Sequence, residues 1–144
     1  MKRVLFFAAV AAVTFASCKK EEPAPVPTNE EQIIDKNWQL TDHIQIIGTL
    51  NNSVYNMLYD NCEKDNLYTF AKPNLYVREE GALKCFVSAP QRDTIYWRMM
   101  DDNNLIIVED LDTSRFSVSS VNETNLKLRY TQNNITNELV YTKR

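Results

Sequence analysis

The sequence contains little glycine, and that shortage excludes one class of enzyme. Only two glycines occur among the 144 residues, Gly48 and Gly81. They are too few and too far apart for a phosphate-cradling loop, so nucleotide enzymes of the Gly-x-Gly-x-x-Gly and Walker types are excluded. We expect asparagine and aspartate to form the turns instead, because both tolerate left-handed backbone. They cluster at 51–52, 101–104, 122–125 and 133–134.

Basic residues are also outnumbered, 16 against 19 acidic residues, which gives a formal net charge of -3 and a pI near 5.2. Nucleic acid is therefore excluded as a partner, because no basic stripe could neutralise its phosphates. The hydrophobic content of 44% and the charged content of 24% are ordinary for a globular protein. The length suits one domain plus whatever is removed or left unpacked at the ends.

Residues that could carry chemistry are scarce as well. His43 is the only histidine, and its place on the polar face of a predicted strand favours a solvated surface residue over a catalytic base. The acidic groups at Asp101-Asp102 and Glu109–Asp112 lack the spacing of a calcium loop, which favours turns and solvated faces. We therefore expect no enzymatic activity, no metal and no cofactor.

The N-terminus has the pattern of a leader. A basic start, Met1–Arg3, precedes the apolar run Val4–Ala16, which is shorter than the ~20 residues of a membrane span. The run ends in Phe15-Ala16-Ser17-Cys18, and there the chain resembles a bacterial lipoprotein precursor. The resemblance implies that residues 1–17 are a signal peptide and that Cys18 becomes the lipidated first residue. The alternative is an ordinary signal peptide with a fortuitous cysteine.

Residues 18–30 then form a linker behind the acylated cysteine. Lys19–Glu22 resembles the signal that sends lipoproteins to the outer face of the outer membrane in one phylum of Gram-negative gut anaerobes; the alternative is a solvated charged linker. Pro23–Pro27 predicts a semi-rigid spacer. The resemblance implies a cell-envelope protein that is attached to the outer membrane through its N-terminal lipid and is exposed on the surface.

Cysteine parity predicts a disulfide. With Cys18 assigned to lipid, Cys62 and Cys85 remain as a pair in an oxidising compartment. Two free thiols or a metal pair are the alternative, but the chain has no Cys-x-x-Cys to build a zinc site. The pair brackets a predicted hairpin that turns at Lys72–Asn74. Closing that loop of about two dozen residues is worth about 3 kcal/mol in the chain-entropy model.

The rest of the chain predicts an all-β fold. Thr28 and Glu31 form a capping-box pattern that predicts a short helix. From Asn37 the period is two, which places Trp38, Leu40, Ile44 and Ile46 on one face. Residues 51–60 predict a loop with a helical turn that covers one end of the strands. Besides the hairpin strands around the Lys72–Asn74 turn, further strands are predicted at Lys84–Ala89, Thr94–Met100, Leu105–Glu109, Ser114–Val121, Leu126–Thr131 and Thr136–Thr142. Eight or nine strands in sequence order favour an antiparallel up-and-down barrel, since closure removes the sheet edges.

Residues 31–144 resemble the lipocalin-like lipoproteins of the same phylum. The resemblance rests on Trp38, Cys62, Phe70, Tyr76, Cys85 and Trp97, and it departs from the pattern at Lys36, where lipocalin-type openings have glycine. It implies a monomeric lipocalin-like β-barrel domain. Asp93-Thr94-Ile95 also resembles the acceptor tripeptide for O-linked glycosylation in exported proteins of that phylum.

Aromatic side chains on the predicted strands supply the candidate site. They could simply fill a small barrel, or they could line a pocket for one small hydrophobic or amphipathic ligand with its mouth near Asn51–Tyr59. The binding hypothesis assigns Trp38, Phe70, Tyr76, Trp97, Phe116 and Tyr130 to the barrel interior. The alternative hypothesis is a non-catalytic interaction module, an accessory subunit that docks on an outer-membrane protein or surface complex.

Overall fold

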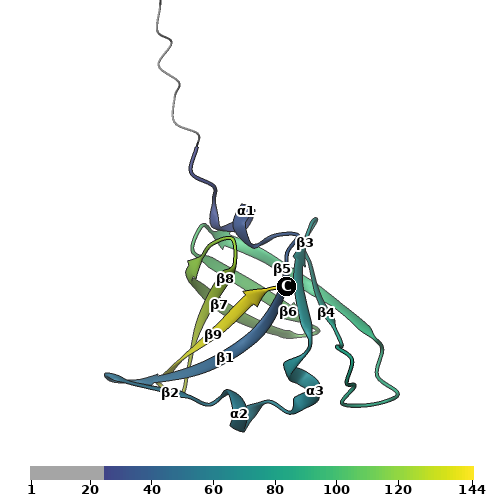
Figure 1. Cartoon of the computed structure of the whole chain (residues 1–144). Coiled ribbons are helices and arrows are strands. Elements are labelled where there is room, and N and C mark those ends of the chain that lie inside the picture. The colour runs from purple at the N-terminus through teal and green to yellow at the C-terminus, as the bar shows by residue number, and fades with distance from the viewer. Residues whose placement is uncertain (1–24) are drawn as a thin grey trace, which may run out of the picture.

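A closed β-barrel forms the body of the protein (Figure 1). The computed structural model describes residues 25–144, and strands make up 57% of it. The predicted signal peptide (1–17) and the predicted lipidation site, Cys18, lie outside the described residues. The helices are α1 (Asn29–Ile33), α2 (Tyr55–Leu58) and α3 (Asn61–Lys64). The strands are β1 (Asn37–Ile47), β2 (Leu50–Ser53), β3 (Leu67–Ala71), β4 (Leu75–Glu79), β5 (Arg92–Asp101), β6 (Asn104–Glu109), β7 (Asp112–Val121), β8 (Asn125–Gln132) and β9 (Ile135–Lys143).

Eight strands close the barrel and a ninth extends it. β1 pairs with β3, and β3 to β9 follow as antiparallel neighbours in sequence order. The barrel closes where β9 pairs with β1 over Trp38 to Ile46, and β2 forms a hairpin with the distal part of β1. The predicted up-and-down barrel is confirmed. The strand predictions from Thr94 onward agree with the observed strands to within two residues.

Helix α1 covers one end of the barrel, called the closed end from here on (Figure 1). The predicted capping box is present, since the Glu31 amide donates to Thr28 Oγ1 (3.2 Å) and the Thr28 amide donates to Glu31 Oε2 (2.8 Å). The backbone amide of Asn29 donates to Asp102 Oδ1 in the β5–β6 turn (3.0 Å). Ile33, the last residue of α1, is fully buried, and the Trp38 indole N–H donates to its carbonyl (2.9 Å).

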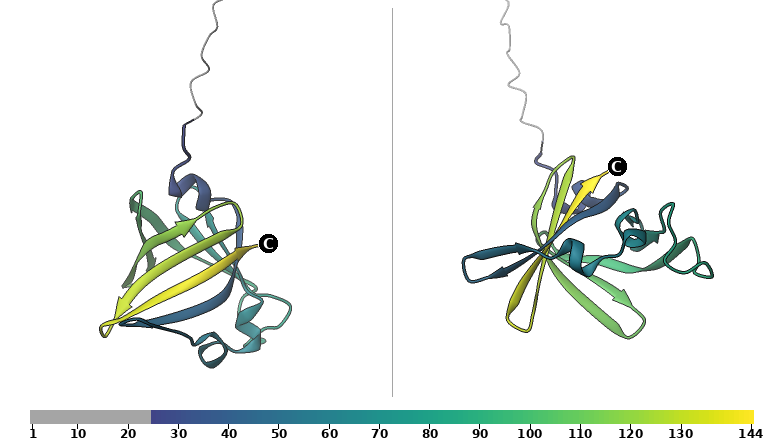
Figure 2. Two further views of the ribbon diagram at one scale, coloured as in Figure 1. Left: turned by 60° about the vertical axis from the view of Figure 1, so that its left-hand side comes forward. Right: turned by 60° about the horizontal axis from the view of Figure 1, so that its bottom comes forward.

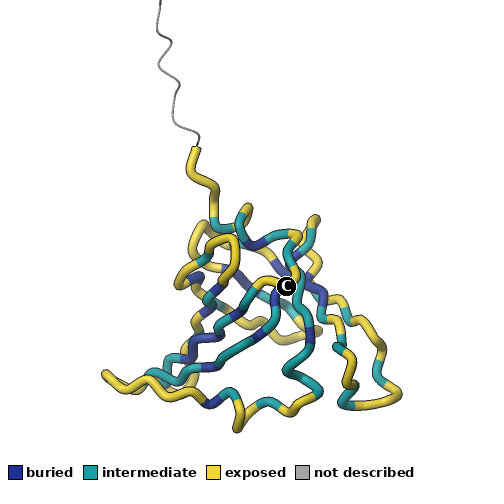
Figure 3. The backbone as a smooth tube through the Cα atoms, viewed as in Figure 1, coloured by how far each residue is buried: buried dark blue, intermediate teal, exposed yellow. Residues whose placement is uncertain are grey.

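The core occupies the half of the barrel next to α1. The Phe70 ring lies 4.9 Å from the rings of both Tyr76 and Trp97. In Figure 3 most of the buried residues, in dark blue, lie within the strands, and the turns are formed mainly by exposed residues. The largest fully buried side chains are Trp38, Trp97, Phe70, Ile33, Leu105, Leu126 and Leu128. This half is filled by its own side chains.

The opposite end is called the open end, and its hairpins fan apart there (Figure 2, right). It consists of α2, α3, the β1–β2, β6–β7 and β8–β9 turns and the β4–β5 loop. Asp110, Asn133 and Asn134 take positive φ in these turns (51°, 52° and 64°), as predicted for a chain whose turns rely on aspartate and asparagine. The helical turn predicted within 51–60 is α2, and it lies at this end.

The predicted strand at Lys84–Ala89 is wrong, because residues 80–91 form a loop. The loop is attached to α3 rather than to the sheet: the Gly81 amide donates to Asn66 Oδ1 (3.1 Å) and the Leu83 amide donates to Asp65 Oδ2 (3.2 Å). The predicted disulfide between Cys62 and Cys85 is confirmed, with the two Cα atoms 5.2 Å apart. It joins α3 to this loop.

A bulge in β1 reverses the face that its later residues present. The pairing with β9 shifts between Leu40 and Asp42, so one extra residue interrupts the alternation. Trp38 and Leu40 point into the barrel as predicted, but after the bulge the inward residue is His43, which is 3% exposed. The prediction that His43 is a solvated surface residue is therefore wrong.

Candidate binding site at the open end of the barrel

The six aromatic residues assigned to the interior divide between the two halves of the barrel. Trp38, Phe70, Tyr76 and Trp97 pack together in the filled half. Phe116 of β7 and Tyr130 of β8 lie toward the open end, with their ring centroids 5.7 Å apart in an edge-to-face arrangement. Phe116 and Tyr130 are partly buried and pack against the core that contains the other four, and they border a cavity.

A cavity of about 590 Å³ lies beside Phe116 and Tyr130. Its inner wall includes Tyr59, just after α2, and Leu139 of β9, and the rest comes from the ends of β7 and β8. A second cavity of about 260 Å³ shares Tyr130 with the first and reaches His43 and Asn137. The volume of the larger of these two cavities, even without the smaller one, lies within the range that small-molecule sites occupy.

A hydrogen-bonded histidine forms the polar wall of this region. His43 Nδ1 lies 3.1 Å from the Tyr59 hydroxyl, and His43 Nε2 lies 3.0 Å from Asn137 Oδ1. Because an amide oxygen only accepts, Nε2 carries the proton, and in the neutral ring the Tyr59 hydroxyl donates to Nδ1. Gln45 Nε2 also donates to Asn137 Oδ1 (3.3 Å). The arrangement fixes the side chain of Tyr59, the residue after α2, at the wall of the cavity.

Burial also keeps the tyrosine hydroxyls of this half protonated. Burial, reinforced by the neighbouring Tyr130, Tyr68 and Glu63, raises the pKa of Tyr59 to about 12. Burial raises the pKa of Tyr130 as well. The cavity therefore offers aromatic faces and neutral hydroxyls to a guest, rather than phenolates.

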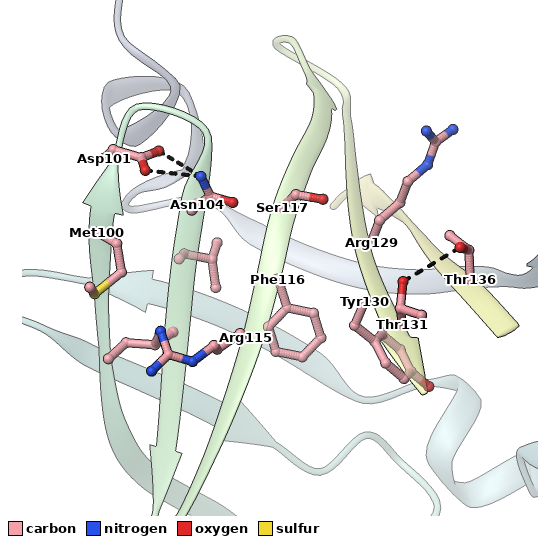
Figure 4. Close-up of a pocket in the computed structure, with 12 residues that line it drawn as sticks. Met100, Asp101, Asn104, Arg115, Phe116, Ser117, Arg129, Tyr130, Thr131 and Thr136 are labelled. Atoms are coloured by element: carbon pink, nitrogen blue, oxygen red, sulfur yellow. Dashed lines mark hydrogen bonds between the residues drawn. The ribbon is translucent and has the colours of Figure 1, made fainter. Parts of the chain in front are cut away.

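The wall of the barrel is split beside the cavity. β7 pairs with β8 from Ser117–Arg129 to Val121–Leu126, so the residues of both strands nearer the open end are not paired with each other. Figure 4 shows Phe116 and Tyr130 facing each other between the diverging strands. Another cavity of about 470 Å³ lies on the outer side of this split and is lined by Arg115 and Arg129, among others.

The acidic groups are turns and faces, as predicted. Asp101 Oδ1 accepts from the Asn103 amide and from Asn104 Nδ2 (2.8 and 2.9 Å), which closes the β5–β6 turn, and these bonds lower the pKa of Asp101. Within residues 25–144, no three His, Cys, Asp or Glu side chains gather into a metal site. Thr94 of the Asp93-Thr94-Ile95 tripeptide is exposed on β5.

Several residues of the site were missed from the sequence. Leu139 lines the larger cavity, while His43 and Asn137 form the polar wall; Tyr59, in the segment predicted to form the mouth, also lines the larger cavity. Leu139 could have been found, because it alternates with Tyr141 on one predicted strand face. Asn137 could not, since a single asparagine in a strand carries no signal that it faces inward.

The comparisons with known proteins leave the function open. No family model and no curated protein matches the sequence. A crystal structure of an uncharacterized protein from Bacteroides eggerthii is similar at a TM-score of 0.49 and 13% identity, covering 78% of this chain and 99% of that chain. None of the helices between residues 25 and 144 is long and apolar enough to cross a bilayer.

Proposed function

We propose that this protein is a non-catalytic binding protein that holds one small amphipathic molecule at the open end of its barrel. The observation that supports the proposal is the 590 Å³ cavity between Phe116, Tyr130, Tyr59 and Leu139, beside a barrel half that is already filled. The aromatic and aliphatic part of the wall favours an apolar body on the guest, and the tyrosine hydroxyls together with the polar residues of β7 and β8 in the lining favour a polar group at one end.

The proposal includes a lipocalin-like lipoprotein of the cell envelope, anchored to the outer membrane through lipid on Cys18. The described chain enters the barrel at the closed end, through the residues that precede α1 (Figure 1). An anchor before this point would hold the closed end toward the bilayer and the open end away from it. In this arrangement the cavity would face the solvent rather than the lipid.

The test measures binding of a hydrophobic probe, anilinonaphthalene sulfonate, to the full chain carrying Cys18→Ala, which cannot be acylated. We expect saturable fluorescence enhancement. Ser114→Trp, which places a large ring in the cavity wall, should weaken binding by about tenfold. Ser120→Trp is the matched control, because Ser120 is exposed on the same strand outside the cavity. Equal probe binding by the two variants would contradict the proposed site.

An accessory subunit is the second candidate, and one observation favours it. Large apolar side chains are exposed on most of the loops of the open end, and Val87 and Leu111 are 93% and 100% exposed. The remaining members of this apolar rim are Ile47, Leu50, Met57, Leu58, Leu83 and Phe86. Exposed apolar clusters of this kind mark interaction surfaces. If the rim docks on an outer-membrane protein, a photo-crosslinker at residue 86 should capture one reproducible partner in cells, and a crosslinker at exposed residue 120 should not.

A further inference from the structure

The split between β7 and β8 exposes strand edges that the rest of the barrel keeps paired. Asp112–Phe116 of β7 is paired on its other side with β6, and Tyr130–Gln132 of β8 is paired on its other side with β9. Both segments are therefore held in strand conformation, although neither has a strand partner across the split. An edge of this kind is a template for another extended chain.

The ladder fixes which backbone groups point into the split. The Val118 amide donates to Asn103 O (2.7 Å), so Val118 faces β6. Because successive residues of a strand present their N–H and C=O groups to opposite sides, Ser117, Arg115 and Thr113 face β8. Ser117 has its partner there, and Arg115 and Thr113 do not.

The same argument applies to β8. The Asn122 amide donates to Asn125 O (2.9 Å), so Asn125 faces β7, and so does Thr131, six residues later. Thr131 lies beyond the last β7–β8 pair, Ser117–Arg129. The split is thus bordered by the N–H and C=O groups of Thr113 and Arg115 on one side and of Thr131 on the other.

The protein closes its other split with its own chain. β1 pairs with β3 only from Asn37 to Gln39, and the segment around α2 and α3 covers the edge beyond that point. The Val54 amide donates to His43 O (2.8 Å), the Tyr55 hydroxyl to Leu40 O (2.8 Å), and Gln39 Nε2 to the Lys64 carbonyl (2.6 Å). No segment within residues 25–144 does the same between β7 and β8, which marks that split as a place for an outside chain.

The two cavities beside the split define the side chains that such a chain would carry. A strand lying along β7 would point alternate side chains inward and outward. Inward lies the cavity that Phe116, Tyr130 and Leu139 line together with polar residues from the ends of β7 and β8, and its apolar part fits an apolar side chain. Outward lies the cavity whose lining includes two cations, Arg115 and Arg129, and one acid, Asp101 at the end of β5; the two cations fit an acidic side chain.

The charge on the outer side supports an acidic residue. Arg115 forms no ion pair with any described residue, and Arg129 and Lys127 share a single carboxylate, Glu138 (2.6 and 3.3 Å). Against Arg115, Arg129 and Lys127 stand two carboxylates, Glu138 and Asp101, so the outer side of the split carries an excess of positive charge. Asp112 lies at the tip of β7, so the acid should sit next to Arg115 and away from the tip.

We propose that the split binds an extended peptide segment of a partner protein as an added strand along the free edge of β7. An apolar side chain of the segment enters the inner cavity, and the neighbouring acidic side chain faces Arg115 and Arg129. The proposal goes beyond the small-molecule function, although both guests use the inner cavity. A peptide and the probe should therefore compete.

The test uses a fluorescent synthetic peptide of about eight residues that alternates leucine and glutamate, titrated onto the full Cys18→Ala chain. The decisive control is the same peptide with N-methyl groups on alternate backbone nitrogens, in both registers. Pairing with β7 uses the N–H groups of one alternate set of peptide residues, so methylating that set should weaken binding by about tenfold, and methylating the other set should weaken it less. In the complex, the amide protons of Thr113, Arg115 and Thr131 should gain protection from solvent exchange.

Variants of Arg115 separate the backbone donor from the charge. Arg115→Pro removes the N–H that faces the split without removing a bond to β6, and Arg115→Ala keeps it. We expect Arg115→Pro to bind the peptide more weakly than Arg115→Ala does. If Arg115→Pro fails to fold, the methylated peptides still decide between pairing and simple apolar contact.

Each outcome bears on one proposal. Absence of saturable peptide binding in a chain that binds the probe overturns the added-strand proposal and leaves the small-molecule function in place. Equal affinity of the methylated and unmethylated peptides overturns it as well. If the peptide binds, methylation weakens that binding and the hydrophobic probe does not bind, the result supports the added strand and removes support from the small-molecule function.

Discussion

A buried polar triad organises the open half of the barrel. His43, Tyr59 and Asn137 come from β1, from the residue after α2 and from β9, and their side chains satisfy one another inside an apolar wall. A buried polar group that loses its partner costs about 1–3 kcal/mol. The triad therefore couples the position of Tyr59 to the barrel wall, and it does so at the edge of the cavity.

The first prediction concerns the bond between His43 and Asn137. We expect His43→Leu and Asn137→Leu each to lower the free energy of unfolding by about 1–3 kcal/mol in urea denaturation, because each leaves a polar partner unsatisfied. The double variant should lose less than the sum of the two, by about 1 kcal/mol. His43→Leu combined with Ser120→Ala, an exposed position, should be additive. Additivity of the first pair would show that the bond contributes nothing.

The second prediction concerns the pH dependence of stability. Burial raises the pKa of Tyr59 and that of Tyr68 to about 12, from an ordinary value of 10.0. A group whose folded pKa is raised contributes stability that is fully present below the unfolded pKa. That stability is lost as the pH rises, here between about 10 and 12. We expect unfolding to become easier across this interval.

Phenolate absorbance during a rapid alkaline titration checks this prediction. Some of the seven tyrosines should ionise late, and Tyr59→Phe should remove one late group. Ionisation of all seven together near pH 10 in the folded protein would contradict the assigned cause.

At the scale of elements, the bulge in β1 limits what the sequence can predict. The alternation Trp38, Leu40, Ile44, Ile46 is correct only up to the bulge, where the pairing shift brings His43 inward. Bulges depend on the partner strand, and the local pattern does not reveal them. The predicted strand at Lys84–Ala89 is wrong for a similar reason. The apolar residues Phe86 and Val87 suggest a strand, but the disulfide to α3 holds them in an exposed loop.

The third prediction concerns the attachment of this loop. A Cβ at Gly81 would lie 2.1 Å from Asp65 Cγ, so Gly81→Ala must displace the carboxylate that accepts from the Leu83 amide. We expect a loss of about 1–3 kcal/mol in denaturant unfolding. In an Asp65→Ala background the same substitution has room and should cost much less. Gly48→Ala serves as a comparison, because Gly48 has open space and only its positive φ of 61° opposes a side chain, at about 1 kcal/mol.

At the scale of the whole molecule, closure of the barrel could be predicted because every strand signal contributes to it. The number and order of the strands were sufficient, even with one strand misplaced. Which half is filled could not be predicted. Trp38, Phe70 and Trp97 lie on predicted strands in the same way as Phe116 and Tyr130, so the sequence does not distinguish the two sets. In the structure the two sets differ because α1 covers only the end of the barrel next to the first set. The split between β7 and β8 depends on where pairing stops, which the continuous alternation of both strands does not indicate.

The last prediction follows from the contrast between the two ends. The closed end combines a helical cover, fully buried aromatic rings and strands that are paired on both sides, whereas the open end has cavities, a split wall and half-buried rings. Opening should therefore require little free energy at the split and close to the full unfolding free energy at the core.

In native-state hydrogen exchange we expect the amides of Thr113, Arg115 and Thr131 to exchange fastest among strand residues. The amides of Phe70 and Trp97 should exchange only on global unfolding. Ile33→Ala, which empties the space under α1, should speed exchange at Trp97 while leaving Arg115 unchanged. Uniform protection across both ends would mean that the barrel opens as one unit and that the split is no softer than the core.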